Sequence, residues 1–231
     1  DLPHIRQMEL YMAGRFMGLD LSARRNLELT QTMRSKEKRG TLLWVLDQTK
    51  TAMGGRLMRS WMERPLLSPA QITKRLGAVE ELTKRTIERE ELLLNLRDVT
   101  DFERAMTRIV TGSCSCRDLA SLAQGAQVLP EIRRLLEGMD ASLLAVLREQ
   151  LDTLEDITSR ILSTIVDEPP LLVREGGLIR SGANAEVDRL RAIQTGGKDM
   201  LAKIEAEEKE KTGIRNLRVG YNRVFGYYIE V

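Results

Sequence analysis

The stretch NAEVDRLRAIQTGGKDMLAKIEAEEKEKT, residues 184–212, decides the architecture that we expect for this chain. Its first half carries apolar side chains at helical spacing, from Val187 to Ile204, and this pattern predicts an amphipathic helix. Its second half has no apolar stripe, and Glu205 and Lys209 form an i,i+4 pair that stabilises an exposed helix. At 1.5 Å per residue the helix would extend roughly 40 Å. We therefore expect it to leave a core and project into solvent.

The residues that follow, NLRVGYNRVFGYYIEV at 216–231, favour β-structure instead. Aromatic residues alternate there with Val219, Val224 and Ile229, a pattern that is typical of strands. We expect a hairpin with its turn near residues 222–226. The predicted fold class is mainly α, with a multi-helix body, a long projecting helix and the start of a small β-rich unit at its tip.

Most of the chain before residue 166 has the pattern of helices joined by loops. Ser68, Thr100 and Ser115 are predicted to cap three of these helices, because each precedes a helix-like run. Pro130 should bend or break the helical segment in which it lies. Apolar residues at spacings of three and four between 141 and 166 predict one buried helical face.

Other segments carry weaker patterns. Residues 4–17 fit a helix, and residues 17–32 fit a strand or irregular structure. The glycine pair at 54–55 lies in a predicted helix, where each glycine costs roughly 1 kcal/mol against alanine. That cost predicts that another backbone packs closely there. Trp44 and Trp61 lie on apolar helical stripes and are predicted to be core residues.

Composition and charge exclude several classes of protein. Lys and Arg number 36 against 34 Asp and Glu, so a nucleic-acid contact would have to come from a local patch. The sequence has no stretch of ~20 apolar residues that could cross a bilayer, and its first residues lack the apolar run of a signal peptide. Two cysteines do not make a disulfide framework, so we expect a cytoplasmic location. Both ends look cut, and we expect a piece of a longer protein.

We expect neither a catalytic site nor a metal site in this chain. The Gly-Lys pair at 197–198 lies in the middle of a helix, without the first Gly and the Ser or Thr of a phosphate-binding loop. Cys114 and Cys116 have no further ligands nearby, whereas zinc sites need about four. We interpret Cys114 and Cys116 as small residues at the start of a helix. The single histidine, His4, lies near one end, so no Ser-His-Asp set is expected.

The tail carries a local excess of positive charge. Arg215, Arg218 and Arg223 outnumber Glu230 between residue 212 and the last residue. Arginines that alternate with Tyr, Asn and Gly on a small sheet suit contact with a phosphate backbone. Arginines on an exposed hairpin are also ordinary surface chemistry, and the spacing alone leaves both interpretations open.

Five motifs stand in order along the chain: RRNLELTQT at 24–32, TAMGGRLMRSWMERPL at 51–66, DFERAMTRI at 101–109, RDLASL at 117–122 and VGYNRVFGYYIEV at 219–231. Together they resemble the central region of the MutS family of bacterial DNA mismatch-recognition proteins. The resemblance covers nearly the whole chain from about Met17. Residues 1–16 resemble the lead-in from a preceding connector domain.

The resemblance implies a domain organisation and a function. It implies a helical core or lever domain at 17–204, followed at 205–231 by the end of the projecting helix and the first hairpin of an incomplete clamp domain. In the family the clamp touches the DNA backbone. The whole protein is a dimeric ATPase that uses ATP and Mg²⁺, binds mismatched double-stranded DNA and recruits downstream repair proteins.

The resemblance also implies what this chain lacks. The family's mismatch-reading segment lies upstream of the matched region, and its Walker A loop lies downstream. The chain would therefore be non-catalytic, without a cofactor or metal of its own. Its role would be that of a stiff lever that couples the ATPase domain to the clamp.

Few individual residues carry over from the family. Arg24–Glu28 match a signature that we interpret as structural, and Gly226 in the tail signature would allow a tight turn or a positive φ. The residues interpreted as hairpin geometry and packing are Gly220, Tyr221, Gly226, Tyr227 and Tyr228. The candidates for contact with the DNA backbone are Arg215, Arg218, Asn222 and Arg223.

Two alternatives remain beside the mismatch protein. One is the recombination-limiting relative of MutS, which has similar core and ATPase parts and does not read mismatches. The other is a helical scaffold that binds only protein partners. Residues 1–16 favour the mismatch protein over its relative, because that relative lacks the N-terminal domains.

Overall fold

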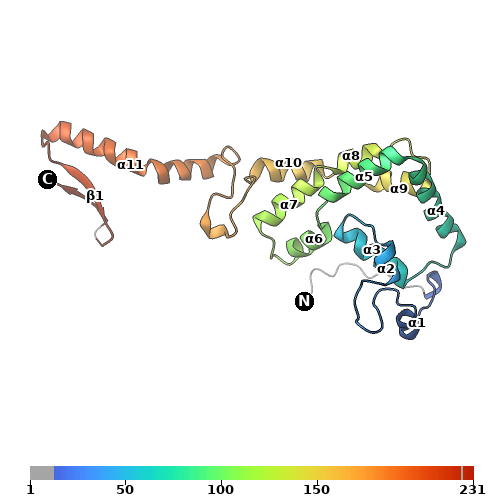
Figure 1. Cartoon of the computed structure of the whole chain (residues 1–231). Coiled ribbons are helices and arrows are strands. Elements are labelled where there is room, and N and C mark those ends of the chain that lie inside the picture. The colour runs from blue at the N-terminus through green and yellow to red at the C-terminus, as the bar shows by residue number, and fades with distance from the viewer. Residues whose placement is uncertain (1–12, 225) are drawn as a thin grey trace. The chain divides into compact units, whose positions relative to one another are not determined.

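The computed structural model describes residues 13–224 and 226–231, without the side chains of residues 13, 195 and 197–200. These residues are mainly helical and contain one two-stranded antiparallel sheet, so the predicted fold class is confirmed (Figure 1). Two compact units are present: a helical unit that ends at Leu178, and an arm unit, Ile179–Val231. The predicted lead-in and His4 lie largely outside the described residues. The predicted domain boundary between residues 204 and 205 stays a prediction.

The described part of the helical unit contains ten α-helices and two short 3-10 segments, Ala13–Arg15 and Val173–Glu175. No helix in the described part of the chain is long and apolar enough to cross a membrane. The α-helices are α1 (Leu21–Asn26), α2 (Leu42–Leu46), α3 (Ala52–Glu63), α4 (Pro69–Lys84), α5 (Thr86–Asp98), α6 (Phe102–Val110), α7 (Cys116–Ala126), α8 (Leu129–Leu135), α9 (Ser142–Gln150) and α10 (Glu155–Thr164).

The core of the helical unit lies where α4, α5, α7, α8 and α9 meet. Helix α4 packs against α5 and α9, and α5 packs against α8. Each of the five helices contributes at least one buried apolar side chain to this cluster: Ala78, Leu92, Ala126, Ile132 and Leu144. Alanines permit close approach of the helices and the larger side chains fill the space between them, as close-packed interiors require.

The helix starts follow the predicted caps only in part. The Ser115 hydroxyl accepts a bond from the backbone N–H of Asp118 at 3.2 Å, and the Asp118 carboxylate accepts one from the Ser115 N–H at 2.9 Å, so the predicted cap of α7 is confirmed. Helix α6 is capped by Asp101, not by the predicted Thr100, because the Asp101 carboxylate accepts the first-turn N–H at 3.3 Å. Ser68 precedes α4 but makes no side-chain cap bond.

Two helix breaks in the second half of the unit have identifiable causes. Pro130 lies in the first turn of α8, and the chain breaks between α7 and α8 as predicted. The single face predicted over 141–166 instead belongs to two helices, α9 and α10. Helix α9 ends before Leu151, whose backbone is extended, and α10 begins after Leu154, which has a left-handed conformation with φ of 53°.

The segment before α2 differs from the prediction. Residues 17–32 contain helix α1, which the sequence pattern assigned to strand or irregular structure. The Asp20 carboxylate caps this helix by accepting the N–H of Ala23 at 2.6 Å. The described end of the helix predicted at 4–17 is a 3-10 turn, after which Phe16 pairs with Leu66 as an isolated β-bridge.

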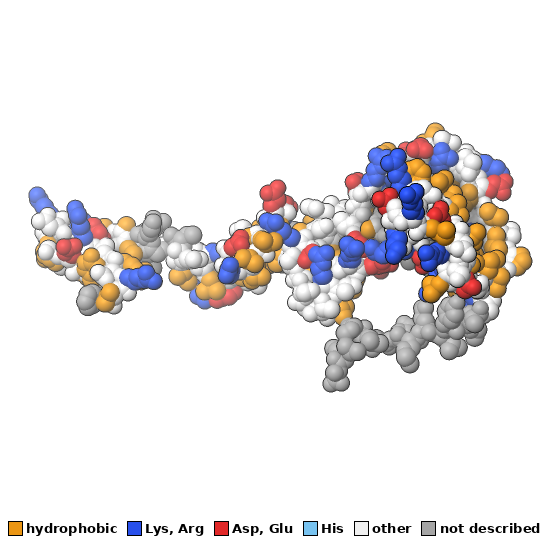
Figure 2. Space-filling view, turned by 60° about the horizontal axis from the view of Figure 1, so that its bottom comes forward, with side chains coloured by type: hydrophobic (Ala, Val, Ile, Leu, Met, Phe, Trp, Pro, Cys, Tyr) orange, Lys and Arg blue, Asp and Glu red, His pale blue; other side chains and the backbone are white. Residues whose placement is uncertain are grey.

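The tryptophans and the glycine pair also correct the predictions. Trp44 and Trp61 remain 49% and 38% exposed, so neither is a core residue. The guanidinium of Arg75 stacks 3.5 Å from the centre of the Trp61 ring, which is a cation–π contact. Apolar side chains are visible on the surface of the helical unit in Figure 2. Gly54 has the side chains of Thr49 and Thr51 as its closest neighbours, rather than another backbone.

One ion cluster joins α3 to the start of α6. The guanidinium of Arg56 donates to both oxygens of Asp101, at 2.9 and 2.6 Å, and to Glu103 at 2.8 and 2.6 Å. Such fork geometry is the strongest form of an arginine–carboxylate pair. The hydrogen bonds from Arg56 lower the pKa of Asp101 to about 2. Asp101 thus caps α6 and connects two helices that are far apart in sequence.

A second polar contact joins α4 to α9, whose N-terminus has no side-chain cap of its own. The Glu81 carboxylate on α4 accepts the backbone N–H groups of Asp140 at 2.9 Å and Ala141 at 2.6 Å. These bonds, with the nearby Arg85, lower the pKa of Glu81. A carboxylate from another helix therefore supplies the anion that a helix N-terminus favours.

Gly125 on α7 generates a stability prediction, because a side chain there would meet the backbone N of Thr100 at 2.7 Å. We expect Gly125→Ala to destabilise the chain by about 1–3 kcal/mol through overpacking. Gly77 on α4 has no atom within 4 Å of the same position. Gly77→Ala should therefore stabilise the chain by about 0.4–1 kcal/mol. Urea unfolding measures the free energy of unfolding of both variants. Equal changes of the same sign in the two variants would contradict the prediction.

The Arg56 cluster generates a pH prediction. A carboxylate whose pKa is lowered on folding stabilises the folded state above its unfolded pKa, and that contribution is lost as the pH falls through its folded pKa. The contribution of Asp101 should thus be complete above about pH 5 and fall between about pH 4 and 2. The difference in unfolding free energy between the unchanged chain and Arg56→Met should shrink over that range. A constant difference down to pH 2 would refute the assignment.

Candidate nucleic-acid interface

The arm unit begins with the long helix that the sequence predicts. Helix α11 is Ala185–Thr212, 28 residues, and the Asn184 side chain caps it by accepting the N–H groups of Glu186 and Val187. Gly213 ends it in a left-handed conformation with φ of 71°. The Gly-Lys pair at 197–198 lies inside this helix, which confirms its helical context. A phosphate-binding loop would need a strand-to-helix turn there.

A hairpin follows the helix. Strand β1 (Arg218–Asn222) pairs antiparallel with β2 (Gly226–Glu230), and Asn222 stands opposite Gly226. Gly226 has φ of 76°, which glycine adopts without strain, so the predicted turn and its positive φ are confirmed. The Asn222 side chain accepts the N–H of Val224 at 2.8 Å and thereby shapes the turn.

The hairpin signature packs across the two strands. A side chain at Gly220 would meet the Tyr228 ring at 2.7 Å, so only glycine lets this tyrosine lie across the opposite strand. Tyr221 and Tyr227 stand opposite each other on the other face, with ring centres 4.9 Å apart. Both remain about two-thirds exposed. These contacts support the interpretation of the signature as packing, and they leave one aromatic face of the hairpin open to solvent.

Glu205 fastens the hairpin to the helix. One oxygen of its carboxylate accepts the backbone N–H of Val219 on β1 at 3.1 Å, and the other pairs with Lys209 at 2.6 Å. The pairing with Lys209 is the main cause of the lowered pKa of Glu205, followed by the bond from Val219 and the charge of Arg218. Leu217, which precedes β1, is buried at 3% exposure. The hairpin is therefore bonded to α11 through the Glu205 carboxylate, and the residue that leads into β1 is buried.

The candidate DNA-contacting residues spread along the hairpin. Arg218 is exposed at its open end, opposite Glu230, whereas Arg223 lies in the turn. These two positions are separated by roughly 15 Å of extended chain. Arg215 is exposed in the connection before β1, and Asn222 uses its side-chain oxygen within the turn. The structure thus exposes the three arginines without bringing them into one cluster.

The chemistry available in the arm unit is hydrogen bonding and charge. Guanidinium and amide donors can bind phosphate oxygens without any covalent step. In the described part of the whole chain, no group of three or more His, Cys, Asp or Glu side chains could hold a metal ion. Cys114 and Cys116 are both free and half-buried, and burial raises the pKa of Cys114. Cys116 begins α7, as the interpretation of a helix start predicts.

Sequence reasoning missed the contact between Glu205 and Val219. The i,i+4 pairing of Glu205 with Lys209 was visible in the sequence and is confirmed. The bond from Val219 joins residues that are 14 positions apart, on either side of the glycine that ends the helix. No local sequence pattern predicts such a contact. Its only sequence signal is a glutamate placed where the apolar stripe of the helix stops.

Comparisons with known proteins agree with this architecture. The chain matches the family described as MutS domain III over residues 22–221. All 231 residues align with proteins named DNA mismatch repair protein MutS: 51% identical in Ruminiclostridium cellulolyticum, 48% in Acetivibrio thermocellus and 43% in Listeria innocua. The chain spans about a quarter of the length of these relatives, 26–27%. The chain belongs to the MutS family, in which it corresponds to domain III.

Proposed function

We propose that this chain is the non-catalytic lever of a longer DNA mismatch-binding repair ATPase. The observation that carries the proposal is the arm unit, in which one 28-residue helix holds the first hairpin of a clamp at its end through Glu205. A helix of that length extends about 42 Å. A displacement at its base would therefore be delivered to the hairpin, provided that the helix and the hairpin move together.

The hairpin supplies the DNA-facing end in this proposal. Arg215, Arg218 and Arg223 are exposed, and they carry charge that a phosphate backbone would neutralise. Asn222 shapes the turn that presents Arg223. Contacts of this kind position a protein on DNA without reading sequence. That fits a clamp whose substrate is defined by a mismatch elsewhere in the complex.

The rest of the activity belongs to other parts of the protein in this proposal. ATP and Mg²⁺ would be held by a nucleotide-binding domain outside these 231 residues. The full-length protein would act in the cytoplasm as a dimer on mismatched double-stranded DNA and recruit downstream repair proteins. The names of the matched relatives support this role, since each is a DNA mismatch repair protein of about four times this length.

Exposed apolar side chains on α11 indicate that a further helix belongs to the lever. Leu190 and Ile193 on its predicted apolar stripe are 54% and 60% exposed, and Ile204 is 39% exposed. An amphipathic helix needs a partner for such a stripe. A returning helix from the remainder of the protein would cover it and stiffen the arm.

Of the alternatives, the recombination-limiting relative receives less support. The relatives named above match all 231 residues, including the lead-in at 1–16 that favours the mismatch protein. The scaffold alternative predicts no dependence of DNA binding on the hairpin arginines. A salt titration therefore separates it from the lever-and-clamp proposal.

The DNA-contact proposal predicts the salt dependence of binding by the full-length protein. Each phosphate contact contributes about 0.9 to the slope of log affinity against log salt concentration. Arg223→Gln should reduce the slope by about that amount, because Arg223 is exposed in the turn. The matched control is Arg189→Gln on α11, which removes an arginine paired with Glu186 and should leave the slope unchanged. Equal slopes for both variants would argue against DNA contact at the turn.

A further inference from the structure

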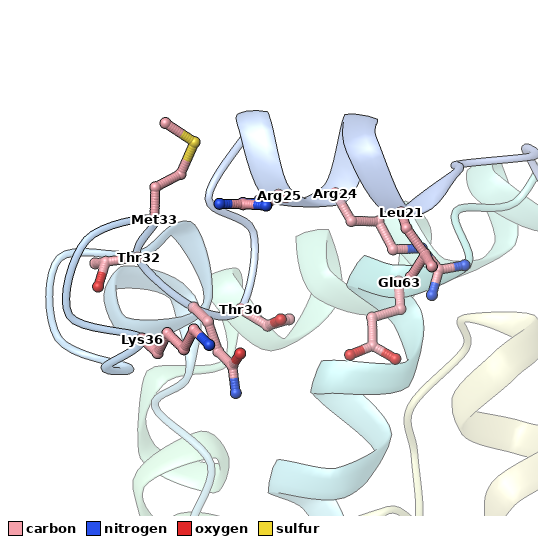
Figure 3. A pocket seen from close by; sticks show the side chains of 9 residues that line it. Leu21, Arg24, Arg25, Thr30, Thr32, Met33, Lys36 and Glu63 are labelled. Atoms are coloured by element: carbon pink, nitrogen blue, oxygen red, sulfur yellow. The ribbon is translucent and has the colours of Figure 1, made fainter.

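The helical unit contains a basic pocket beneath α1, far along the sequence from the hairpin. It has a volume of about 430 Å³, and its charged lining is Arg24, Arg25, Lys36 and Glu63. Thr30 and Thr32 add hydroxyl groups. Figure 3 shows Arg24 and Glu63 on one side, at α1 and α3, and Thr32 and Lys36 on the opposite side, in the loop after α1. We call this site the α1 pocket.

The loop that forms one wall of the α1 pocket is held by its own hydrogen bonds. The Glu28 carboxylate accepts the backbone N–H of Met33 at 2.6 Å. The backbone of Thr32 exchanges bonds with Lys36 and Glu37, at 3.1 and 3.0 Å. Glu28 and Lys36 both have positive φ, 45° and 55°, which non-glycine residues rarely adopt. Backbone strain of this kind clusters at active sites, ligand clamps and switch regions.

The cations of the α1 pocket exceed the carboxylates available to them. Among the residues that the structure describes, no carboxylate forms an ion pair with Arg25 or Lys36. Glu63 is already paired with Arg59 at 2.9 Å. Arg24 uses its Nε to donate to the Leu19 carbonyl at 3.0 Å, which orients its guanidinium and leaves the terminal nitrogens available. Three cations of the lining thus face one carboxylate, Glu63, which Arg59 already holds.

We propose that the α1 pocket binds a small oligophosphate, a ligand with two or three phosphate groups and little apolar surface. Three cations and two hydroxyl groups match the charge and the acceptor oxygens of such an anion. A ligand with a single negative charge would leave most of this positive charge uncompensated. The pocket volume lies within the range of small-ligand sites, about 300–1,000 Å³.

The composition of the α1 pocket favours an oligophosphate over nucleic acid as its ligand. Its lining contains no aromatic ring on which a base could stack. A duplex presents its phosphates on a convex surface, whereas these cations line a concavity. The oligophosphate can be inorganic or can be the phosphate tail of a nucleotide, and both share the same recognition chemistry.

Isothermal titration calorimetry of the 231-residue chain with inorganic tripolyphosphate tests the proposal. We expect one binding site per chain, and we expect Arg25→Gln/Lys36→Gln to weaken binding at least about tenfold, because charge-assisted bonds are lost. The matched control is Arg34→Gln/Arg39→Gln, which removes two exposed charges of the same segment that do not line the pocket. It should change the affinity by less than about twofold, because these two side chains lie outside the lining and their charge reaches the ligand only through screening solvent.

Three results would overturn the proposal: no binding of tripolyphosphate, equal loss in both double variants, or tighter binding of a short duplex DNA through Arg25 and Lys36. Equal loss would indicate diffuse attraction to a basic surface, and the DNA result would indicate a nucleic-acid site. A second titration with ATP identifies the source of the ligand. Tighter binding of ATP than of tripolyphosphate indicates a nucleotide as the ligand, and equal or weaker binding indicates that the pocket recognises the phosphate groups alone, as in an inorganic oligophosphate.

Discussion

The bond between the Glu205 carboxylate and the backbone N–H of Val219 is the constraint on which the arm unit depends. A two-stranded hairpin is marginally stable by itself in water. Here its first strand is joined to α11 by this bond, and Leu217, which precedes the strand, is buried. Lys209 holds the same carboxylate from the following helical turn, so the orientation of Glu205 is fixed on two sides.

The helical unit obtains its rigidity in a different way. Its buried cluster is built from Leu, Ile, Met and Ala, and the two tryptophans stay outside it. Helices that meet at the edges of the cluster are joined by carboxylates that serve two helices at once. Asp101 caps α6 while it binds Arg56 from α3, and Glu81 on α4 caps α9. Helix starts in this unit are thus fixed by tertiary contacts as well as by their own sequences.

Features with local causes could be predicted from the sequence, and features with distant causes could not. Asn184, Gly213 and Gly226 are local signals, and the bounds of α11 and the turn of the hairpin follow them closely. The pairing of Arg56 with Asp101 spans 45 positions and left no pattern to recognise. Trp61 was misassigned because a helical apolar stripe does not reveal whether another element covers it, and here Arg75 stacks on it.

The same difference between local and distant causes applies to the residues of the candidate interface. The hairpin residues Gly220 and Gly226 were recognisable from the family signature, and the structure adds the reasons: the Tyr228 ring lies against Gly220, and Gly226 has a positive φ. The role of Glu205 could be recognised only from the structure, because its partner Val219 lies on a different element. The DNA contacts proposed for Arg215, Arg218 and Arg223 rest on exposure and charge, since no partner is present to orient them. The basic pocket beneath α1 likewise combines Arg24 and Arg25 with Lys36 and Glu63 from separate elements.

We propose that in the full-length protein the joint between α11 and its hairpin couples the ATPase domain to the DNA. The most direct measurement is the ratio of DNA-stimulated to basal ATP hydrolysis in the full-length protein carrying Glu205→Ala, with the exposed neighbour Glu207→Ala as control. We expect Glu205→Ala to lower this ratio without changing the basal rate, and Glu207→Ala to retain the ratio. If Glu205→Ala left the ratio unchanged, the joint would not couple the ATPase domain to the DNA.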